Sequence, residues 1–315
     1  MLELREVTVA LGDAENAPVL LSEITARFPR GEVCALLGPS GSGKTTLVRA
    51  VAGIARTTGG SLHWGNMDLE LEDLPPSQIG YVPQFTISQE NLTTEENILL
   101  ALRLRVAGLG GAALGARASE LLELTGLTSA APTLSKHLSG GQRRRLALAM
   151  ELASEPPLLL CDEVTSGLDA RSEREILELL RRIAREGNRV VLVVTHGLRD
   201  LGAFDKVAVL VGGHLAYLGP PDMAPHYFRA DHAEEIFERL PQREPAEWHT
   251  SWVKHRTHFD KPAPDKPPHE ESDEEHPTAN LPGPVSQFLT LLATRWKIFF
   301  RHKSNIALQL GLVLG

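Results

Sequence analysis

Short apolar runs recur along residues 1–240 and are separated by amphipathic or polar stretches. Each run is short enough to be one buried strand, and the stretches between the runs are typical of surface helices. Strands that alternate with helices predict a largely parallel sheet with helices on its faces, which is an α/β fold. The runs are VCALL, IGYV, PLLLC, RVVLVVTH and KVAVLV.

The pattern changes between Gln84 and the sequence LSGGQ at Leu138–Gln142. The segments ENILLALRLRV and ASELLELTGL are helical in period, and no convincing strand lies among them. We therefore predict a helical subdomain at about residues 86–152, inserted into a sheet domain that spans residues 1–240.

A linker is expected at residues 241–284, with disorder from about residue 255. From His255 to Pro284 the chain is rich in proline and acidic side chains and almost free of aliphatic ones. Such a composition buries too little apolar surface to fold alone.

Residues 285–315 have a different character, because they contain four basic side chains and no acidic one. At helical spacing one face is apolar and carries Phe288, Leu291, Leu292, Trp296 and Phe299. The opposite face carries Gln287, Thr290, Thr294, Lys297 and Arg301. This pattern predicts a connecting helix that lies in a membrane interface, and a helix docked on the protein core is the alternative.

The sequence IALQLGLVLG at the end of the chain carries no charge. Ten helical residues reach only about 15 Å, half of a hydrocarbon core of roughly 30 Å. We expect it to be the start of a first transmembrane helix, and the chain to be a fragment of a longer membrane protein.

Bulk composition excludes some classes of protein. The net charge of -8 disfavours a nucleic-acid binder, which needs a basic surface. Cys34 and Cys161 lie inside apolar runs, so burial is favoured over a disulfide or a metal site. The N-terminus lacks the long apolar run of a signal peptide, so nothing there directs secretion.

A phosphate-binding loop is predicted at GPSGSGKTT, between the apolar run VCALL and a helical stretch. Its glycines let consecutive backbone N–H groups point at phosphates, and the helix that follows adds its positive end. Lys44 would hold the β- and γ-phosphates, and the Thr45 hydroxyl would bind Mg²⁺. The loop consists of Gly38, Pro39, Ser40, Gly41, Ser42, Gly43, Lys44, Thr45 and Thr46.

The order of three motifs narrows the class of phosphate-binding protein to which the chain is similar. The loop is followed far downstream by LSGGQ, and about twenty residues later by the apolar run LLLCDE. This order resembles the ATP-binding cassette (ABC) family over residues 1–240. The resemblance implies that two copies of the domain clamp ATP between the phosphate loop of one and the LSGGQ signature of the other.

The resemblance also assigns roles to single residues. Asp162 would be the Mg²⁺ partner and Glu163 the base that activates the attacking water. Gln84 would reach the metal and the water, His196 would contact the γ-phosphate, and Asp169 would cross the dimer interface. A helix N-terminus would be presented to the partner's γ-phosphate by Ser139, Gly140, Gly141 and Gln142.

Two positions depart from the family pattern. Val164 follows the glutamate where the family usually has proline, which loosens the loop without removing a catalytic atom. The first strand-loop has Ala10 or Leu11 before Gly12 where an aromatic side chain usually stacks on adenine. Base specificity is therefore open.

The subtype resembles the G subfamily (White and drug or lipid half-transporters) and its bacterial relatives. This likeness rests on MELASEPPLLLCDEVTSGLD, YLGPPDMAPHYF and QFLTLLATRWKIFFRHKSN. It implies an exporter at the cytoplasmic face of the membrane, with a permease domain on the same chain and a second ATPase domain as partner. The substrate is not implied.

Two other functions are carried as alternatives. A soluble ABC ATPase in translation or DNA repair would have a second cassette or a basic tail. A regulator that binds ATP without hydrolysis would lack the base or the signature, whereas Glu163, Gln84 and His196 are all present.

Overall fold

The computed structural model describes residues 1–12, 17–69, 71–72, 74–84, 87–198, 200–259 and 281–301. These residues form two compact units. The first unit draws on residues 1–85 and 157–276, and the second draws on residues 86–156 and 277–315.

A six-stranded sheet forms the centre of the first unit, in the order β10-β9-β3-β8-β7-β6. Neighbouring strands are parallel except for β9 and β10. Every residue of β3, β7 and β8 is buried, as continuous apolar runs require in a parallel sheet. The predicted α/β sheet is confirmed. Its strands are β3 (Val33–Leu37), β6 (Ile79–Val82), β7 (Leu158–Asp162), β8 (Val190–Val194), β9 (Lys206–Val211) and β10 (His214–Gly219).

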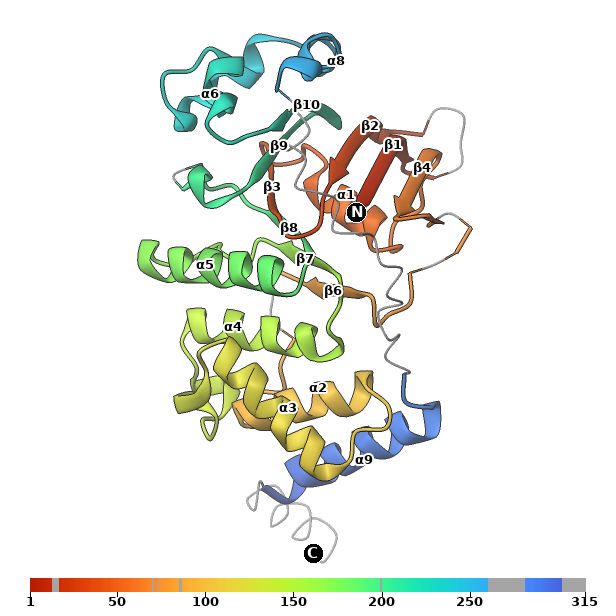
Figure 1. Ribbon diagram of the computed structural model, residues 1–315, viewed down its shortest axis with the longest axis vertical. Helices are drawn as coiled ribbons and strands as arrows, with labels where there is room; N and C mark the ends of the chain where they lie inside the picture. Colours follow the sequence, from red (N-terminus) through yellow and green to blue (C-terminus); the bar gives the residue numbers. More distant parts are fainter. Residues whose placement is uncertain are drawn as a thin grey trace, which may run out of the picture. The chain divides into compact units, whose positions relative to one another are not determined.

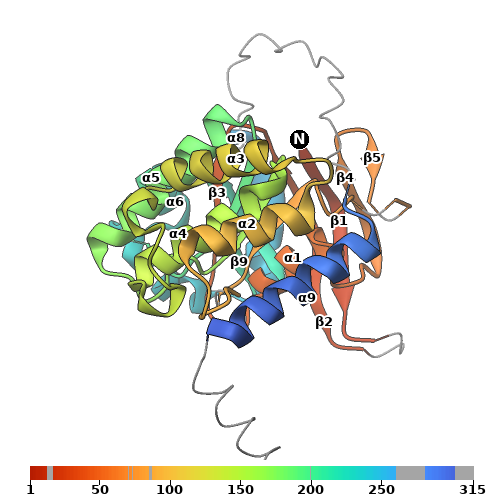
Figure 2. The ribbon, with the colours of Figure 1, turned by 90° about the horizontal axis from the view of Figure 1, so that it is seen from below.

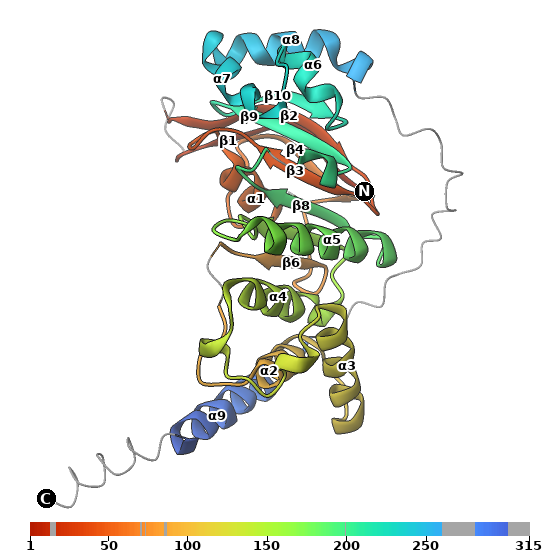
Figure 3. The ribbon, with the colours of Figure 1, turned by 90° about the vertical axis from the view of Figure 1, so that its left-hand side faces the viewer.

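Helices cover both faces of this sheet. Helix α1 (Lys44–Val51) and helix α5 (Ala170–Glu186) lie on opposite sides of the strands (Figures 1 and 3). The parallel strands β3, β7 and β8 run in the same direction, so the segments that follow them emerge at one edge. In open α/β sheets that edge is where ligands bind.

A second sheet in this unit is antiparallel and has the order β2-β1-β4-β5. Alternation of apolar and polar residues indicates a half-buried strand but does not show which sheet the strand joins, so the sequence did not predict this second layer. Its alternation buries one face of each strand. The strands are β1 (Leu2–Ala10), β2 (Val19–Phe28), β4 (Gly59–Trp64) and β5 (Met67–Asp68).

Helix α8 (Pro245–Phe259) corrects part of the expected linker. Trp248 and Trp252 are buried, and the Trp252 ring lies 5.4 Å from that of Tyr217 on β10. The chain is therefore helical through residue 259, and Pro284 at the other end of the expected disorder begins α9. Residues 260–280 lie outside the described residues. The shorter elements nearby are η4 (Leu201–Ala203), α6 (Met223–Phe228), η5 (Ala233–Glu235), α7 (Ile236–Arg239) and η6 (Leu240–Gln242).

In the described residues of the second unit all the regular elements are helices, and Thr93 and Leu134 form one isolated bridge. Its buried side chains are mainly leucine and alanine, so the helices pack closely. Its elements are α2 (Thr94–Arg105), α3 (Gly111–Leu124), η1 (Thr128–Ala130), η2 (Ser135–His137), α4 (Gly140–Glu151), η3 (Leu152–Ser154) and α9 (Pro284–Arg301).

Helix α9 lies beside α2 and packs through its polar face (Figure 2). Gln287 Nε2 donates to the carbonyl of Leu104 over 3.3 Å. The apolar face carries Phe288 and Trp296, which are 62% and 56% exposed. The helix therefore docks on the protein, as in the alternative considered above, but it does so with the face opposite to the one that a core-docked helix would bury.

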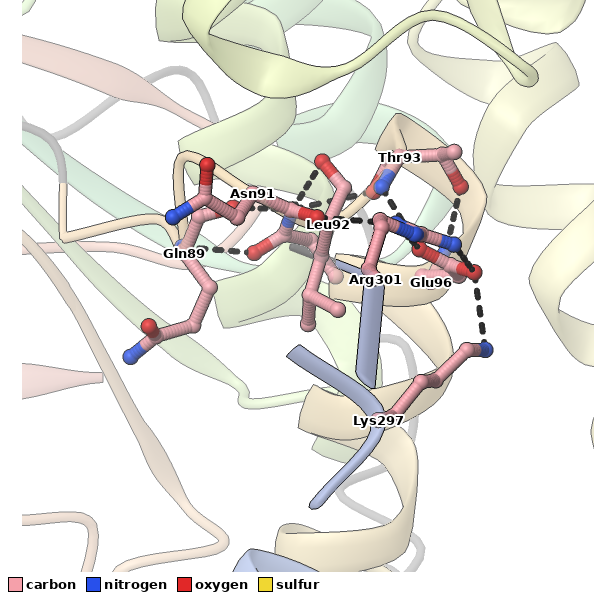
Figure 4. A network of polar contacts seen from close by, with 8 residues as sticks. Gln89, Asn91, Leu92, Thr93, Glu96, Lys297 and Arg301 are labelled. Atoms are coloured by element: carbon pink, nitrogen blue, oxygen red, sulfur yellow. Dashed lines mark hydrogen bonds and ion pairs between the residues drawn. The ribbon is translucent and has the colours of Figure 1, made fainter. Parts of the chain in front are cut away.

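Glu96 is the centre of this docking (Figure 4). The Arg301 guanidinium donates to both of its carboxylate oxygens over 2.7 and 2.8 Å, and Lys297 Nζ lies 2.7 Å from Oε1. Glu96 also closes the capping box of α2 by accepting from the backbone N–H of Thr93. The hydrogen bond with Arg301 is the main reason why the pKa of Glu96 is lowered to about 2, and Lys297 lowers it further.

Among the residues that the structure describes, the helices are too short or too polar to cross a bilayer. The expected start of a transmembrane helix at residues 306–315 lies outside the described residues.

Candidate nucleotide site

The phosphate loop connects β3 to α1 and has the glycine conformations that its sequence predicts. Gly41 and Gly43 have φ values of 76° and 99°, in the left-handed region that other residues avoid. A Cβ atom on Gly38 would lie 2.2 Å from the carbonyl oxygen of Leu210. Glycine is thus required at Gly38 by space and at the other two by backbone conformation.

Lys44 begins α1 and is 5% exposed. Its ammonium donates to the carbonyls of Gly38 and Pro39 over 2.8 and 2.9 Å, so the side chain lies in the curl of its own loop. Burial lowers the pKa of Lys44, and the nearby carboxylates of Glu163 and Asp162 oppose this effect. Ser42 Oγ in the same loop is buried with no hydrogen-bond partner in the described chain. A lysine and an orphan hydroxyl in this curl fit a phosphate group.

Asp162 ends β7 and is 6% exposed. Thr45 Oγ1 donates to its Oδ1 over 3.4 Å, and Tyr81 Oη donates to its Oδ2 over 3.3 Å. Burial raises the pKa of Asp162, the Tyr81 hydrogen bond lowers it, and the Glu163 charge raises it. Because Thr45 uses its hydrogen on Asp162, its lone pairs remain for a cation. An oxygen donor set of this kind suits Mg²⁺.

Glu163 follows directly and is held at both carboxylate oxygens. Gln84 Nε2 donates to Oε2 and His196 Nε2 lies against Oε1, each over 2.7 Å. The Glu163 backbone has φ 54°, an uncommon conformation for a residue with a side chain, and such backbones cluster at functional sites. The side chain is 18% exposed, so water reaches it. This geometry suits a base that orients and deprotonates water.

Three sequence-predicted residues thus meet at one carboxylate. Gln84 follows β6, Glu163 follows β7 and His196 follows β8, so the parallel sheet brings their side chains together. Val164, the residue after Glu163, is fully buried. Tyr81 is a site residue that the sequence analysis missed, and its position three residues before Gln84 was the available signal.

Asp169 is the N-cap of α5 in this structure. Its Oδ1 accepts from the backbone N–H groups of Arg171 and Ser172 over 3.1 and 3.0 Å. These hydrogen bonds lower the pKa of Asp169, and the one from the Ser172 backbone has the largest effect. The role at a dimer interface that the resemblance implies remains a prediction.

The LSGGQ signature lies in the second unit, at the start of α4. Ser139 is the N-cap of a capping box, in which its hydroxyl accepts from the Gln142 backbone over 3.2 Å. The Gln142 side chain in turn accepts from the Ser139 backbone over 2.9 Å. The Ser139 hydroxyl keeps its hydrogen to donate, and Gly140 and Gly141 supply backbone N–H groups at a helix N-terminus.

The predicted base-stacking position lies at the end of β1. Leu11 is 66% exposed, and Gly12 has φ 101°. In the described residues no aromatic ring takes the place of Leu11 in this loop, which agrees with the departure seen in the sequence.

Cys34 and Cys161 are free and buried, and burial raises the pKa of the Cys34 thiol. The expectation of buried cysteines is confirmed.

A glycine-rich loop that enters a helix from a parallel strand, with two acids at the end of a neighbouring strand, defines a P-loop nucleotide hydrolase domain. Comparison with known proteins narrows the class. Residues 21–166 match the family model described as ABC transporter. Residues 21–166 are thus similar to the ATP-binding domain of ABC transporters.

Curated relatives agree with this family. The chain is 37% identical over 227 residues to the methionine import ATP-binding protein MetN of Photobacterium profundum, covering 70% of this chain and 65% of the relative. It is 37% identical over 205 residues to the sulfate/thiosulfate import ATP-binding protein CysA of Bacillus cereus, covering 64% of this chain and 57% of the relative. The chain thus spans less than two thirds of these relatives.

Solved structures agree as well. The ATP-binding cassette MJ0796, in a dimeric post-hydrolysis state with ADP and Pi, is 29% identical to the chain. The TM-score is 0.62, and the match covers 70% of this chain and 99% of that one. Another dimeric structure of the same bacterial transporter cassette matches equally well.

Proposed function

We propose that this chain hydrolyses ATP to drive transport of a substrate across a membrane. The observation that carries the proposal is Glu163, which is held at one oxygen by Gln84 and at the other by His196. A carboxylate fixed in this way is ready to accept a proton from water that attacks the γ-phosphate. Lys44 and the loop N–H groups would bind the phosphates of ATP.

Mg²⁺ would be held by the Thr45 hydroxyl, with Gln84 and Asp162 beside it. Its chemistry there is to neutralise charge on the β- and γ-phosphates. Asp162 fixes the Thr45 hydroxyl so that its lone pairs face away from the carboxylate. Glu163 then receives the water proton, and His196 holds this carboxylate at its other oxygen.

The working form would be a pair of ATPase domains. The first unit carries the phosphate loop and the base, while Ser139, Gly140, Gly141 and Gln142 belong to the second unit. A signature with its own helix N-terminus serves as a γ-phosphate site for a partner's nucleotide. The dimeric states of the solved relatives support this arrangement.

The membrane contact would be made by α9 and the residues after it. Its apolar face, defined by Phe288, Leu291, Leu292, Trp296 and Phe299, is exposed by 38% or more at every position. An exposed apolar patch of this kind marks a membrane or protein contact. Lys297 and Arg301 are paired with Glu96, so on the described helix only Arg295 among the predicted basic residues is left for lipid headgroups.

The finer proposal is an exporter of the G type, in which the ATPase precedes a membrane domain on one chain at the cytoplasmic face. The order of ATPase, α9 and apolar tail supports it. An ATPase subunit of an importer is the second candidate, because the relatives MetN and CysA are named as import proteins.

Hydrolysis is tested by phosphate release from ATP by the purified chain in Mg²⁺ and in EDTA. Release that is absent in both would overturn the proposal. The membrane contact is tested by flotation with vesicles of the full chain against a chain that ends at Phe259. Each lipid-facing basic side chain contributes about 1 kcal/mol on anionic vesicles, so one such residue predicts a modest preference over zwitterionic ones.

Equal flotation of both chains would remove α9 as a membrane contact and favour a separate ATPase subunit. The matched variant is Trp296→Ser with Phe288→Ser, which removes apolar area and leaves the Glu96 ion pairs in place. Flotation should fall in this variant while its melting temperature stays close to that of the wild type.

A further inference from the structure

Both oxygens of the Asp162 carboxylate have a hydroxyl donor, and only one of these donors belongs to the phosphate loop. Thr45 reaches Oδ1 from α1, and Tyr81 reaches Oδ2 from β6. A carboxylate with one donor on each oxygen has less freedom to rotate than one with a single donor. Tyr81 thus completes a fixed orientation for Asp162.

The position of Tyr81 follows from the register of the sheet. On β6 it lies beside Leu160 of the parallel strand β7, two residues before Asp162. Pro83 follows the last residue of β6 and has no backbone N–H for the sheet, so the strand ends before Gln84. One short segment therefore contacts both acids, Asp162 through Tyr81 and Glu163 through Gln84.

A cation completes this chain of contacts. Arg49, in the last turn of α1, opposes the rise in the Tyr81 pKa that burial and Asp162 cause, so its cation acts on this hydroxyl. Arg49 is an exposed residue, and its charge also acts on Asp162. Thr45 and Arg49 both belong to α1, so the carboxylate is connected to this helix by two routes.

We infer that Tyr81, supported by Arg49, is a positioning residue for magnesium-dependent ATP binding and hydrolysis. It holds Asp162 so that Oδ1 keeps the Thr45 hydrogen bond, which leaves the Thr45 lone pairs directed to the metal. Tyr81 itself contacts neither metal nor nucleotide. The inference rests on the proposed function, since it concerns the same site.

The test uses Tyr81→Phe in the full chain, because this variant loses one oxygen and keeps the ring. The readouts are the affinity of a fluorescent ATP analogue in Mg²⁺ and in EDTA, and the Mg²⁺ concentration that gives half-maximal phosphate release. We expect binding in EDTA to be unchanged, and the Mg²⁺ requirement to rise about three- to tenfold, as for loss of one hydrogen bond. kcat should fall while KM for ATP at saturating Mg²⁺ stays constant.

Two further variants make the result specific. Arg49→Gln should shift the Mg²⁺ requirement in the same direction by a smaller factor, and it leaves the Tyr81 ring in place. Tyr227→Phe removes a hydroxyl in the aromatic cluster beneath α8, and it should leave Mg²⁺ dependence unchanged.

Failure of this inference and failure of the proposed function are distinguishable. If Thr45→Ala raises the Mg²⁺ requirement but Tyr81→Phe and Arg49→Gln do not, Tyr81 only packs, and the inference is overturned while the site stands. If Thr45→Ala also has no effect, the site itself is wrong. A Tyr81→Phe chain that melts well below the wild type while Arg49→Gln shows no shift also counts against the inference.

Discussion

Gln84 and Glu163 are hydrogen-bonded over 2.7 Å although they follow different strands and are 79 residues apart in sequence. The bond leaves the second oxygen of Glu163 to His196, so the carboxylate is fixed from two sides. Gln84 is also the last described residue before the helical unit begins.

Replacing Glu163 with glutamine should abolish ATP turnover and preserve ATP binding. The amide keeps the size of the carboxylate and one acceptor oxygen for Gln84 but does not accept the water proton, so a loss of about 10²- to 10⁴-fold is expected. Phosphate release and equilibrium binding of ATP measure the two effects. Glu178→Gln, an exposed substitution on α5, is the control. Turnover at the wild-type rate in Glu163→Gln would exclude this residue as the base.

Replacing Lys44 with alanine should weaken nucleotide binding itself. The ammonium is the buried cation of the phosphate loop, and a charge-assisted hydrogen bond contributes about 1.5–3 kcal/mol, or roughly ten- to 150-fold in affinity. Titration with a fluorescent ATP analogue tests this. Lys254→Ala, which removes an exposed charge on α8, should bind as the wild type does. Similar affinity in both variants would contradict the assignment of Lys44.

Substitutions at Ser139 distinguish the structural role of the LSGGQ signature from its proposed role at a partner's phosphate. Ser139→Asp keeps a good N-cap for α4 but places a negative charge where a γ-phosphate would bind. We expect a nearly unchanged melting temperature and loss of ATPase activity. Ser139→Ala should instead destabilise the unit by about 1 kcal/mol.

If two ATPase domains clamp the nucleotide, ATPase activity depends on the association of two chains. Specific activity of the wild-type chain should rise with protein concentration. A constant rate from a chain shown to be monomeric by sedimentation would contradict the clamp.

Adenine should be poorly discriminated, because Leu11 occupies the position where a ring usually stacks. A stacking contact contributes about 0.5–1.5 kcal/mol, so GTP should compete within about tenfold of ATP. Leu11→Tyr should sharpen the preference for ATP. Strong rejection of GTP by the wild type would mean that another residue recognises the base.

Acid should loosen α9 from α2. The folded-state pKa of Glu96, about 2, lies below its ordinary value of 4.5, so its ion pairs stabilise the fold above about pH 4.5. This contribution is lost progressively as the pH falls from about 4.5 toward 2. It amounts to about 1 kcal/mol, because solvent screens the partly exposed groups.

Glu96→Gln isolates the ion pairs, because glutamine also completes a capping box. Hydrogen exchange in α9 should become faster in this variant, and high salt should have the same effect on the wild type. Slow exchange in α9 of Glu96→Gln at low salt would show that Arg301 and Lys297 do not hold the helix.

Much of the nucleotide site could be predicted from sequence because its chemistry is local. Gly41 and Gly43 are needed for a left-handed backbone, and Lys44 needs a fixed place in the helix that follows. Asp162 and Glu163 directly end an apolar run, which a parallel sheet turns into a strand end. Such patterns hold in any chain that binds a phosphate in this way.

The tertiary structure decided what depends on contacts between distant segments. Helix α8 is ordered because Trp248 and Trp252 find the aromatic side chains near β10, and composition does not show that partner. The Tyr81 contact with Asp162 depends on the register of β6 with β7. The helical period of the sequence showed which residues of α9 share a face. Glu96 on α2 determined which of the two faces docks, because a docked face needs a complementary surface that only the folded chain supplies.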